Sequence, residues 1–212
     1  MQVYSDTELH LTFQYPGELK PLDAQAVAEL RRQAMFGNDP LVDTGKLNAQ
    51  ACSKVLLAVG TGTAGSGSGR APAPGAGAGN GPFSGRISLL EIEGSCIPPV
   101  ALRKSRAMDG VLSALVSEGT TALGMMPLGQ AVGYRLEGRH AWFAAAQGQP
   151  VETTALQPGG QELIGSLGIA VSGRILTWTV ESDELTYFNR LLASRLDLGT
   201  GKPEPLFPAP IH

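Results

Sequence analysis

The chain has 212 residues, of which 42% are hydrophobic and only 17% charged, and its formal net charge is −3. This composition supports a globular core but argues against a nucleic-acid-binding protein, which needs clustered Lys and Arg. The densest basic set here is Arg103, Lys104 and Arg106. No apolar stretch approaches the roughly 18 to 20 residues of a membrane span, so we expect none.

The first predicted strand covers residues 8–15, where apolar and polar side chains alternate. A turn containing Gly and Pro follows, and Asp23 is then placed to cap a helix over residues 24–36. The residues before the strand lack the basic start and apolar centre of a signal peptide. That observation leaves open whether a leader was removed.

A second strand is predicted over residues 51–59, and it runs into a tract dominated by Gly, Ala and Pro. Gly60, Gly62 and Gly65 have the spacing of a dinucleotide-binding fingerprint. That motif needs a helix directly after the glycines, whereas the residues that follow are poor helix formers. We therefore expect no nucleotide cofactor, and a flexible loop over residues 60–84 inserted between two strands.

The next predicted strand covers residues 86–96 and forms an antiparallel hairpin with residues 51–59. Pairing about the centre of the loop sets Cys52 opposite Cys96, close to disulfide range. We predict that they form a disulfide that closes the base of the loop. The alternatives are two free thiols or, less well supported, a metal site, because the three His residues are scattered. A disulfide implies a periplasmic or secreted protein.

A helix is predicted over residues 104–124, because its apolar side chains recur at helical spacing. Two hairpins are predicted after it, over residues 132–149 and 162–182, each with a two-residue turn that contains Gly. These turns are Glu137-Gly138 and Ser172-Gly173.

A last helix is predicted over residues 184–196, capped by Ser182 or Asp183, before a proline-rich tail over residues 199–212. Hairpins dominate this order of elements, and no run of strand–helix–strand units appears. We therefore predict a single α+β domain over residues 1–198, with an antiparallel sheet of about six to seven strands flanked by about three helices.

Four residues are candidates for chemistry. His140 follows a hairpin turn and could act as a base if a carboxylate oriented it, although an exposed strand histidine is the simpler interpretation. Glu91 and Glu93 lie on one face of a predicted strand, as an acid–base pair or, more simply, as a solvent-exposed face. Asp109 lies in a predicted helix and is expected to pair with Arg106. No catalytic residue or metal ligand is assigned.

Several stretches carry a resemblance to known proteins: LTFQYPGELKPLD from residue 11, the two cysteines flanking a variable loop, VGYRLEGRHAWFAAAQG from residue 132, and GRILTWTVESDELTYFNRLLASRL from residue 173. Over most of residues 8–198 the chain resembles a family of uncharacterised exported bacterial proteins. Its Phe13-x-Tyr15-Pro16 opening also resembles PsbP-like domains, which are α/β/α sandwiches with accessory and protein-binding roles. The resemblance supplies no catalytic residue, and the long Gly-rich loop departs from a compact PsbP-like domain.

The sequence thus predicts an exported, non-enzymatic domain that binds a protein or a small ligand, without a cofactor. One alternative is a hydrolase-like enzyme with a dispersed site that involves His140, Asp109 or the pair Glu91 and Glu93. Another is an envelope-associated structural protein that uses its tail and its loop as contact segments.

Overall fold

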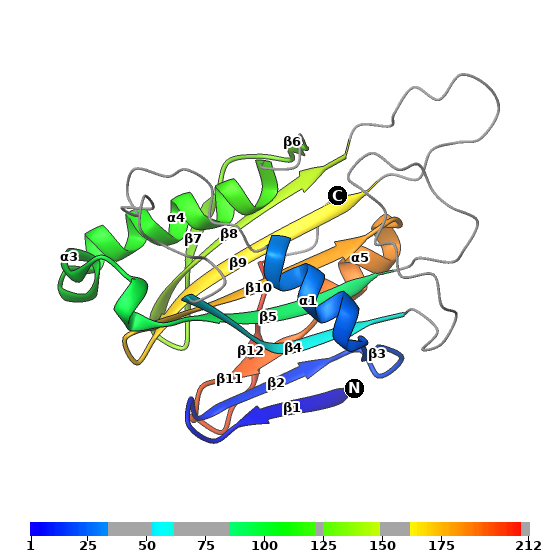
Figure 1. Ribbon diagram of the computed structural model, residues 1–212, viewed down its shortest axis with the longest axis horizontal. Helices are drawn as coiled ribbons and strands as arrows, with labels where there is room; N and C mark the ends of the chain where they lie inside the picture. The colour runs from blue at the N-terminus through cyan, green and yellow to red at the C-terminus, as the bar shows by residue number, and fades with distance from the viewer. Residues whose placement is uncertain (34–51, 62–84, 122–124, 149–161, 209–212) are drawn as a thin grey trace.

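The computed structural model describes residues 1–33, 52–61, 85–121, 125–148 and 162–208. Within these ranges the protein is mixed α+β, with two antiparallel sheets and four α-helices (Figure 1). The predicted class is confirmed. One antiparallel sheet of about six to seven strands with about three helices was predicted, whereas the described residues hold two sheets, of eight and four strands, and four α-helices.

The larger sheet contains eight strands, all antiparallel to their neighbours. They are β3 (Lys20–Pro21), β4 (Ser53–Gly60), β5 (Arg86–Ile92), β6 (Met126–Pro127), β7 (Val132–Leu136), β8 (Arg139–Gln147), β9 (Leu163–Val171) and β10 (Arg174–Ser182). Their order is β3-β4-β5-β10-β9-β8-β6, and β7 also pairs with β8. The long central strands of this sheet form the base on which the other elements pack.

Both predicted hairpins are confirmed, with the turns at the predicted residues. Glu137 and Gly138 have φ values of 46° and 76°, and Ser172 and Gly173 have φ values of 50° and 78°. Two consecutive positive φ values give a turn whose twist matches that of the strands, and Gly at the second position adopts this conformation without steric cost.

The predicted pairing of the first two long strands is also confirmed, from Ser53 opposite Ile92 to Gly60 opposite Arg86. The strand predicted over residues 86–96 is too long, because the chain leaves the sheet after Ile92 and forms a short 3₁₀ helix, η2 (Gly94–Cys96). Of the predicted loop, residues 62–84 lie outside the described residues, and Gly60 belongs to β4.

The smaller sheet brings together the two ends of the described chain. Its strands, in spatial order, are β1 (Gln2–Asp6), β2 (Leu11–Tyr15), β11 (Arg195–Asp197) and β12 (Glu204–Pro205). The strand predicted over residues 8–15 begins only at Leu11, because Asp6 Oδ1 accepts the backbone N–H groups of Glu8 and Leu9 and shapes a turn there. In the predicted tail, β12 is followed by two buried side chains, Leu206 and Phe207.

Four α-helices are described: α1 (Ala24–Gln33), α3 (Pro99–Arg103), α4 (Ser105–Thr121) and α5 (Leu185–Leu192). Asp23 caps α1 as predicted, since its Oδ1 accepts the N–H of Ala26 at 2.8 Å. The cap predicted for α5 is wrong: the N-cap residue is Glu184, with no side-chain capping bond. The helix predicted over residues 184–196 ends at Leu192, because Arg195–Asp197 join the smaller sheet as β11.

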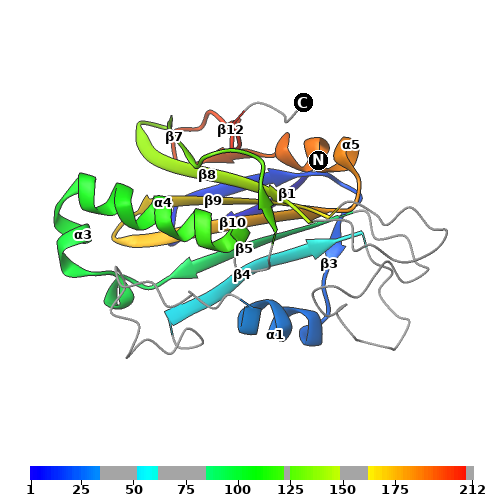
Figure 2. The same cartoon turned by 90° about the horizontal axis from the view of Figure 1, so that it is seen from above.

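The elements pack on both faces of the larger sheet (Figure 2). Helices α3 and α4 cover one face, where Leu112 packs near Ile92 and Ile175. The smaller sheet and α5 cover the other, where Phe13 of β2 packs against Trp178 with ring centroids 6.0 Å apart. Among the described residues no helix is long and apolar enough to cross a membrane.

Candidate functional site

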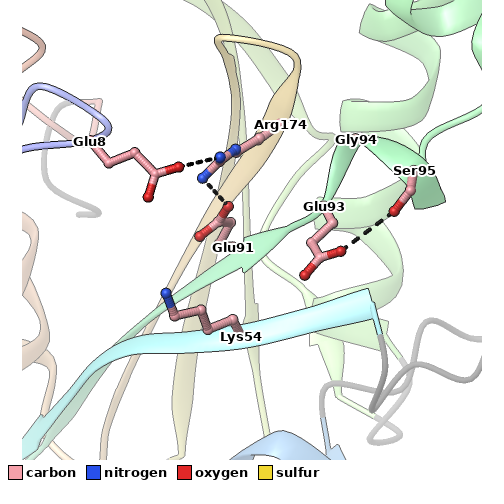
Figure 3. Close-up of a pocket in the computed structure, with 7 residues that line it drawn as sticks. All are labelled: Glu8, Lys54, Glu91, Glu93, Gly94, Ser95 and Arg174. Atoms are coloured by element: carbon pink, nitrogen blue, oxygen red, sulfur yellow. Dashed lines mark hydrogen bonds and ion pairs between the residues drawn. The ribbon is translucent and has the colours of Figure 1, made fainter.

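An open pocket of about 390 Å³ lies where β4 and β5 approach the turn between β9 and β10 (Figure 3). Its lining consists of Glu8, Lys54, Glu91, Glu93, Gly94, Ser95 and Arg174. Five of these seven residues carry charged side chains, and they come from four separate segments of the chain. The volume suits a small ligand, and the lining is polar where most drug-sized sites are mainly apolar.

Glu91 is the innermost charged group of the pocket. Its side chain is 6% exposed, which corrects the prediction that it lies on a solvent-exposed face. The predicted alternation of side chains between the two faces of β5 was right, because Glu91 lies on the same face as the buried Ile87 and Leu89. That face is covered by the smaller sheet and by the turn before β2, so a carboxylate there is removed from water.

Arg174 compensates the buried charge of Glu91. Its Nη1 donates a hydrogen bond of 2.6 Å to Glu91 Oε1, and its Nη2 donates to Glu8 Oε1. The hydrogen bond to Glu8, together with the nearby Glu91 carboxylate, raises the pKa of Arg174 above its ordinary value. The two carboxylates thus hold the guanidinium from both sides. The buried Glu91 carboxylate is both paired with a cation and hydrogen-bonded, as a buried ion must be.

One wall of the pocket, beside the turn that carries Arg174, is built by η2, which a disulfide attaches to Cys52, the residue directly before β4. Cys52 and Cys96 form the predicted disulfide, with a Cα–Cα distance of 5.9 Å. The backbone N–H of Glu93 also donates to the carbonyl of Cys52 at 3.1 Å. Covalent and hydrogen bonds therefore fix the segment that presents Glu93 and Ser95 to the pocket.

Gly94 allows that wall to approach the turn between β9 and β10. A Cβ at this position would lie 2.5 Å from the carbonyl oxygen of Gly173, a contact that real Cβ atoms do not make. Any larger residue would push η2 away from the turn that leads into Arg174. The shape of the pocket therefore depends on Gly94 as well as on its charged residues.

Glu93 and Lys54 are exposed residues of the pocket lining. Glu93 is exposed, and its Oε2 accepts a hydrogen bond of 3.5 Å from the Ser95 hydroxyl. Lys54 stands opposite Glu91 in the β4–β5 register but makes no ion pair with any residue that the structure describes. The sequence analysis named two of the three carboxylates of the pocket, Glu91 and Glu93. It missed Glu8, Lys54 and Arg174, although cross-strand pairing with residues 51–59 would have pointed to Lys54.

The other two candidates meet elsewhere, between β8 and α4. His140 Nδ1 lies 2.8 Å from Asp109 Oδ1 and 3.0 Å from Oδ2, and the indole N–H of Trp142 donates to Oδ1 at 3.3 Å. The predicted pairing of Asp109 with Arg106 is thus replaced by a contact across the helix–sheet interface. The side chains of His140 and Asp109 are 43% and 23% exposed.

An imidazole held at Nδ1 by a carboxylate can act as a base through Nε2, but nucleophilic catalysis also needs a hydroxyl or thiol beside it. Within the described ranges, no Ser, Thr or Cys side chain hydrogen-bonds to His140. Nor do these ranges hold a group of three or more His, Cys, Asp or Glu residues that could bind a metal ion. The charged pocket is therefore a better-supported functional site than the pair of His140 and Asp109.

No protein-family model matches this chain, and no curated protein is found to be similar to it. The resemblance to PsbP-like domains stays a prediction.

Proposed function

We propose that this chain is an exported binding domain that takes a small polar ligand in the pocket between β4, η2 and the β9–β10 turn. The main observation behind this proposal is that some charged residues of the pocket are paired with one another and others are not. Arg174 is held by Glu91 and Glu8, whereas Lys54 and Glu93 are exposed residues of the lining. Ionic groups held in place before binding lower the cost of ordering them around a ligand.

The disulfide supports the exported location. Disulfides persist in oxidising compartments and are rare in the cytosol of most organisms. The Cys52–Cys96 bridge also orders one wall of the pocket, so the compartment and the binding site are linked by one covalent bond. We propose a periplasmic or secreted location on this basis.

The layering of the fold supports a PsbP-like α/β/α sandwich as the finer architecture. Helices α3 and α4 lie on one face of the larger sheet, and α5 lies on the opposite face beside the smaller sheet. The smaller sheet is an addition to that architecture. An accessory or binding role, as in PsbP-like domains, agrees with a polar pocket that lacks a catalytic constellation.

Native mass spectrometry tests the proposal on protein taken from its own host with free thiols blocked. We expect Cys52 and Cys96 to escape alkylation, and we expect extra mass under native conditions that disappears on denaturation. The Glu93→Gln and Lys54→Gln variants should lose this mass, whereas Lys202→Gln, an exposed lysine outside the pocket, should keep it. Alkylation of both cysteines, or equal retention of the mass by all three variants, would overturn the proposal.

A hydrolase-like activity is the second candidate, and the contact of His140 with Asp109 is the observation that favours it. The carboxylate orients the imidazole, so a water molecule could be deprotonated at Nε2. Hydrolysis of an activated aryl ester that is lost in both His140→Gln and Asp109→Asn would establish this candidate. Hydrolysis that persists in both variants would eliminate it.

A further inference from the structure

The charged residues of the pocket also indicate the chemical class of its ligand, an inference that rests on the proposed function. Three carboxylates and two cationic groups line the pocket, which gives it a net charge of −1 at neutral pH. The distribution of these charges, more than their total, decides what can bind.

Arg174 is not available to a ligand. Its two terminal nitrogens donate to Glu91 and to Glu8, and both of these partners are carboxylates. An anion that reached the guanidinium would meet both carboxylates at close range. Arg174 therefore serves to hold Glu91 in place, and the anion-binding group must be another residue.

Lys54 is that residue. It is exposed on β4, and its Cα lies opposite that of Glu91 in the strand register. Figure 3 shows its side chain directed toward Glu91 across the pocket, and no ion pair with a described residue occupies the ammonium group. It can therefore donate to a ligand carboxylate.

Glu93 offers the complementary charge. Among the described contacts, the only hydrogen bond to its carboxylate comes from the Ser95 hydroxyl at 3.5 Å, so most of the acceptor capacity of the carboxylate remains. In Figure 3 its carboxylate turns toward β4, the strand that carries Lys54. An ammonium group placed there would also lie near Glu91.

We infer that the ligand is a small zwitterion, of the class of amino acids, with its ammonium group at Glu93 and its carboxylate at Lys54. A dicarboxylate would bring a second negative charge toward Glu91 and Glu93. A diamine would bring a second positive charge toward Lys54. A molecule with both charges makes charge-assisted hydrogen bonds to Glu93 and to Lys54 at once, and about 390 Å³ accommodates a molecule of this size.

Nuclear magnetic resonance titration of the full chain tests this inference with three probes of similar length: 4-aminobutyrate, putrescine and succinate. We expect saturable shifts of the backbone amides of Lys54, Glu93 and Ser95 with 4-aminobutyrate and much weaker ones with the other two. Lys54→Gln and Glu93→Gln should each weaken binding of 4-aminobutyrate about tenfold, the loss of one charge-assisted hydrogen bond. Lys202→Gln is the matched control and should leave the affinity unchanged.

The outcomes separate the inference from the proposed function. If putrescine or succinate binds more tightly than 4-aminobutyrate, the zwitterion is wrong and the pocket remains a binding site. If none of the three probes shifts these amides at millimolar concentration, both the inference and the proposed pocket are wrong. Equal affinity in Lys54→Gln and Lys202→Gln would remove Lys54 from the site and overturn the inference as well.

Discussion

His140 Nδ1 lies 2.8 Å from Asp109 Oδ1, and this contact joins strand β8 to helix α4 across 31 residues of sequence. The same carboxylate oxygen accepts the indole N–H of Trp142. One acidic side chain thus receives two donors from alternate residues of one strand. The arrangement fixes the rotation of α4 relative to the sheet.

Removal of the Asp109 carboxylate should destabilise the protein more than removal of the imidazole. Asp109→Ala leaves two donors without their acceptor, whereas His140→Ala leaves the Trp142 contact intact. Because the pair is partly exposed, we expect losses in the free energy of unfolding of about 1–2 kcal/mol and below about 1 kcal/mol, respectively. Urea unfolding measures both, and a larger loss in His140→Ala would contradict the shared role of the carboxylate.

Substitution of Arg174 should be more harmful than substitution of either partner. Arg174→Met leaves the Glu91 carboxylate buried without a counter-charge, whereas Glu8→Gln removes only the exposed partner. The urea midpoint should therefore fall clearly in Arg174→Met and little in Glu8→Gln. The double variant Arg174→Met/Glu91→Leu should recover much of the loss, and failure to recover would mean that Arg174 acts through packing alone.

Reduction of the disulfide should lower stability without changing the fold. The Cys52–Cys96 bridge spans a sequence separation of 44, for which the chain-entropy estimate is about 4 kcal/mol. Guanidinium unfolding of the wild type with and without a reductant measures the difference. The variant Cys52→Ala/Cys96→Ala is the control, since it should match the reduced wild type and should not respond to reductant.

The tyrosines should make the protein less stable at strongly alkaline pH. The chain has four tyrosines, Tyr4, Tyr15, Tyr134 and Tyr187, and burial raises the pKa of each. For Tyr187, burial and the nearby Glu18 carboxylate together raise the pKa to about 12. Above pH 10, the ordinary value, the unfolded chain releases these protons while the folded chain keeps them. The free energy of unfolding must therefore fall as pH rises beyond 10.

Absorbance at tyrosinate wavelengths checks this prediction. The native protein should show little ionisation at pH 10, whereas the chain in concentrated guanidinium should be about half ionised there. Glu18→Gln should lower the pKa of Tyr187, because Tyr187 donates a hydrogen bond of 3.3 Å to Glu18. Superimposable native and unfolded titrations would contradict the burial of these side chains.

Local patterns in the sequence predicted local structure well. The turns at Glu137-Gly138 and Ser172-Gly173 follow from two residues and their flanking alternation. The smaller sheet was not predicted beyond β2. Strand β1 pairs with β2 in a local hairpin that the sequence analysis missed. Strand β11 has only three residues and joins β2 through long-range pairing, such as Arg195 with Gln14. No periodicity within three residues could have indicated it.

The candidate site likewise combines features that local sequence predicted with features that depend on long-range contacts. Alternation placed Glu91 on the same face as Ile87 and Leu89, but it could not say what covers that face. The covering turn and the guanidinium come from residues 8 and 174, an interval of 166 positions. Residue type alone nominated His140 and Asp109, and only the fold joined them into a pair.

The β4–β5 hairpin is secured at both ends. The disulfide joins one end, and at the other the N–H of Thr61 donates to the carbonyl of Gly85 at 3.0 Å while the N–H of Gly85 donates to Thr61 Oγ1 at 3.2 Å. The register of the two strands is therefore independent of whatever connects Thr61 to Gly85. Codons can be gained or lost there during evolution, and an epitope or reporter peptide can be spliced in, while the larger sheet keeps its alignment.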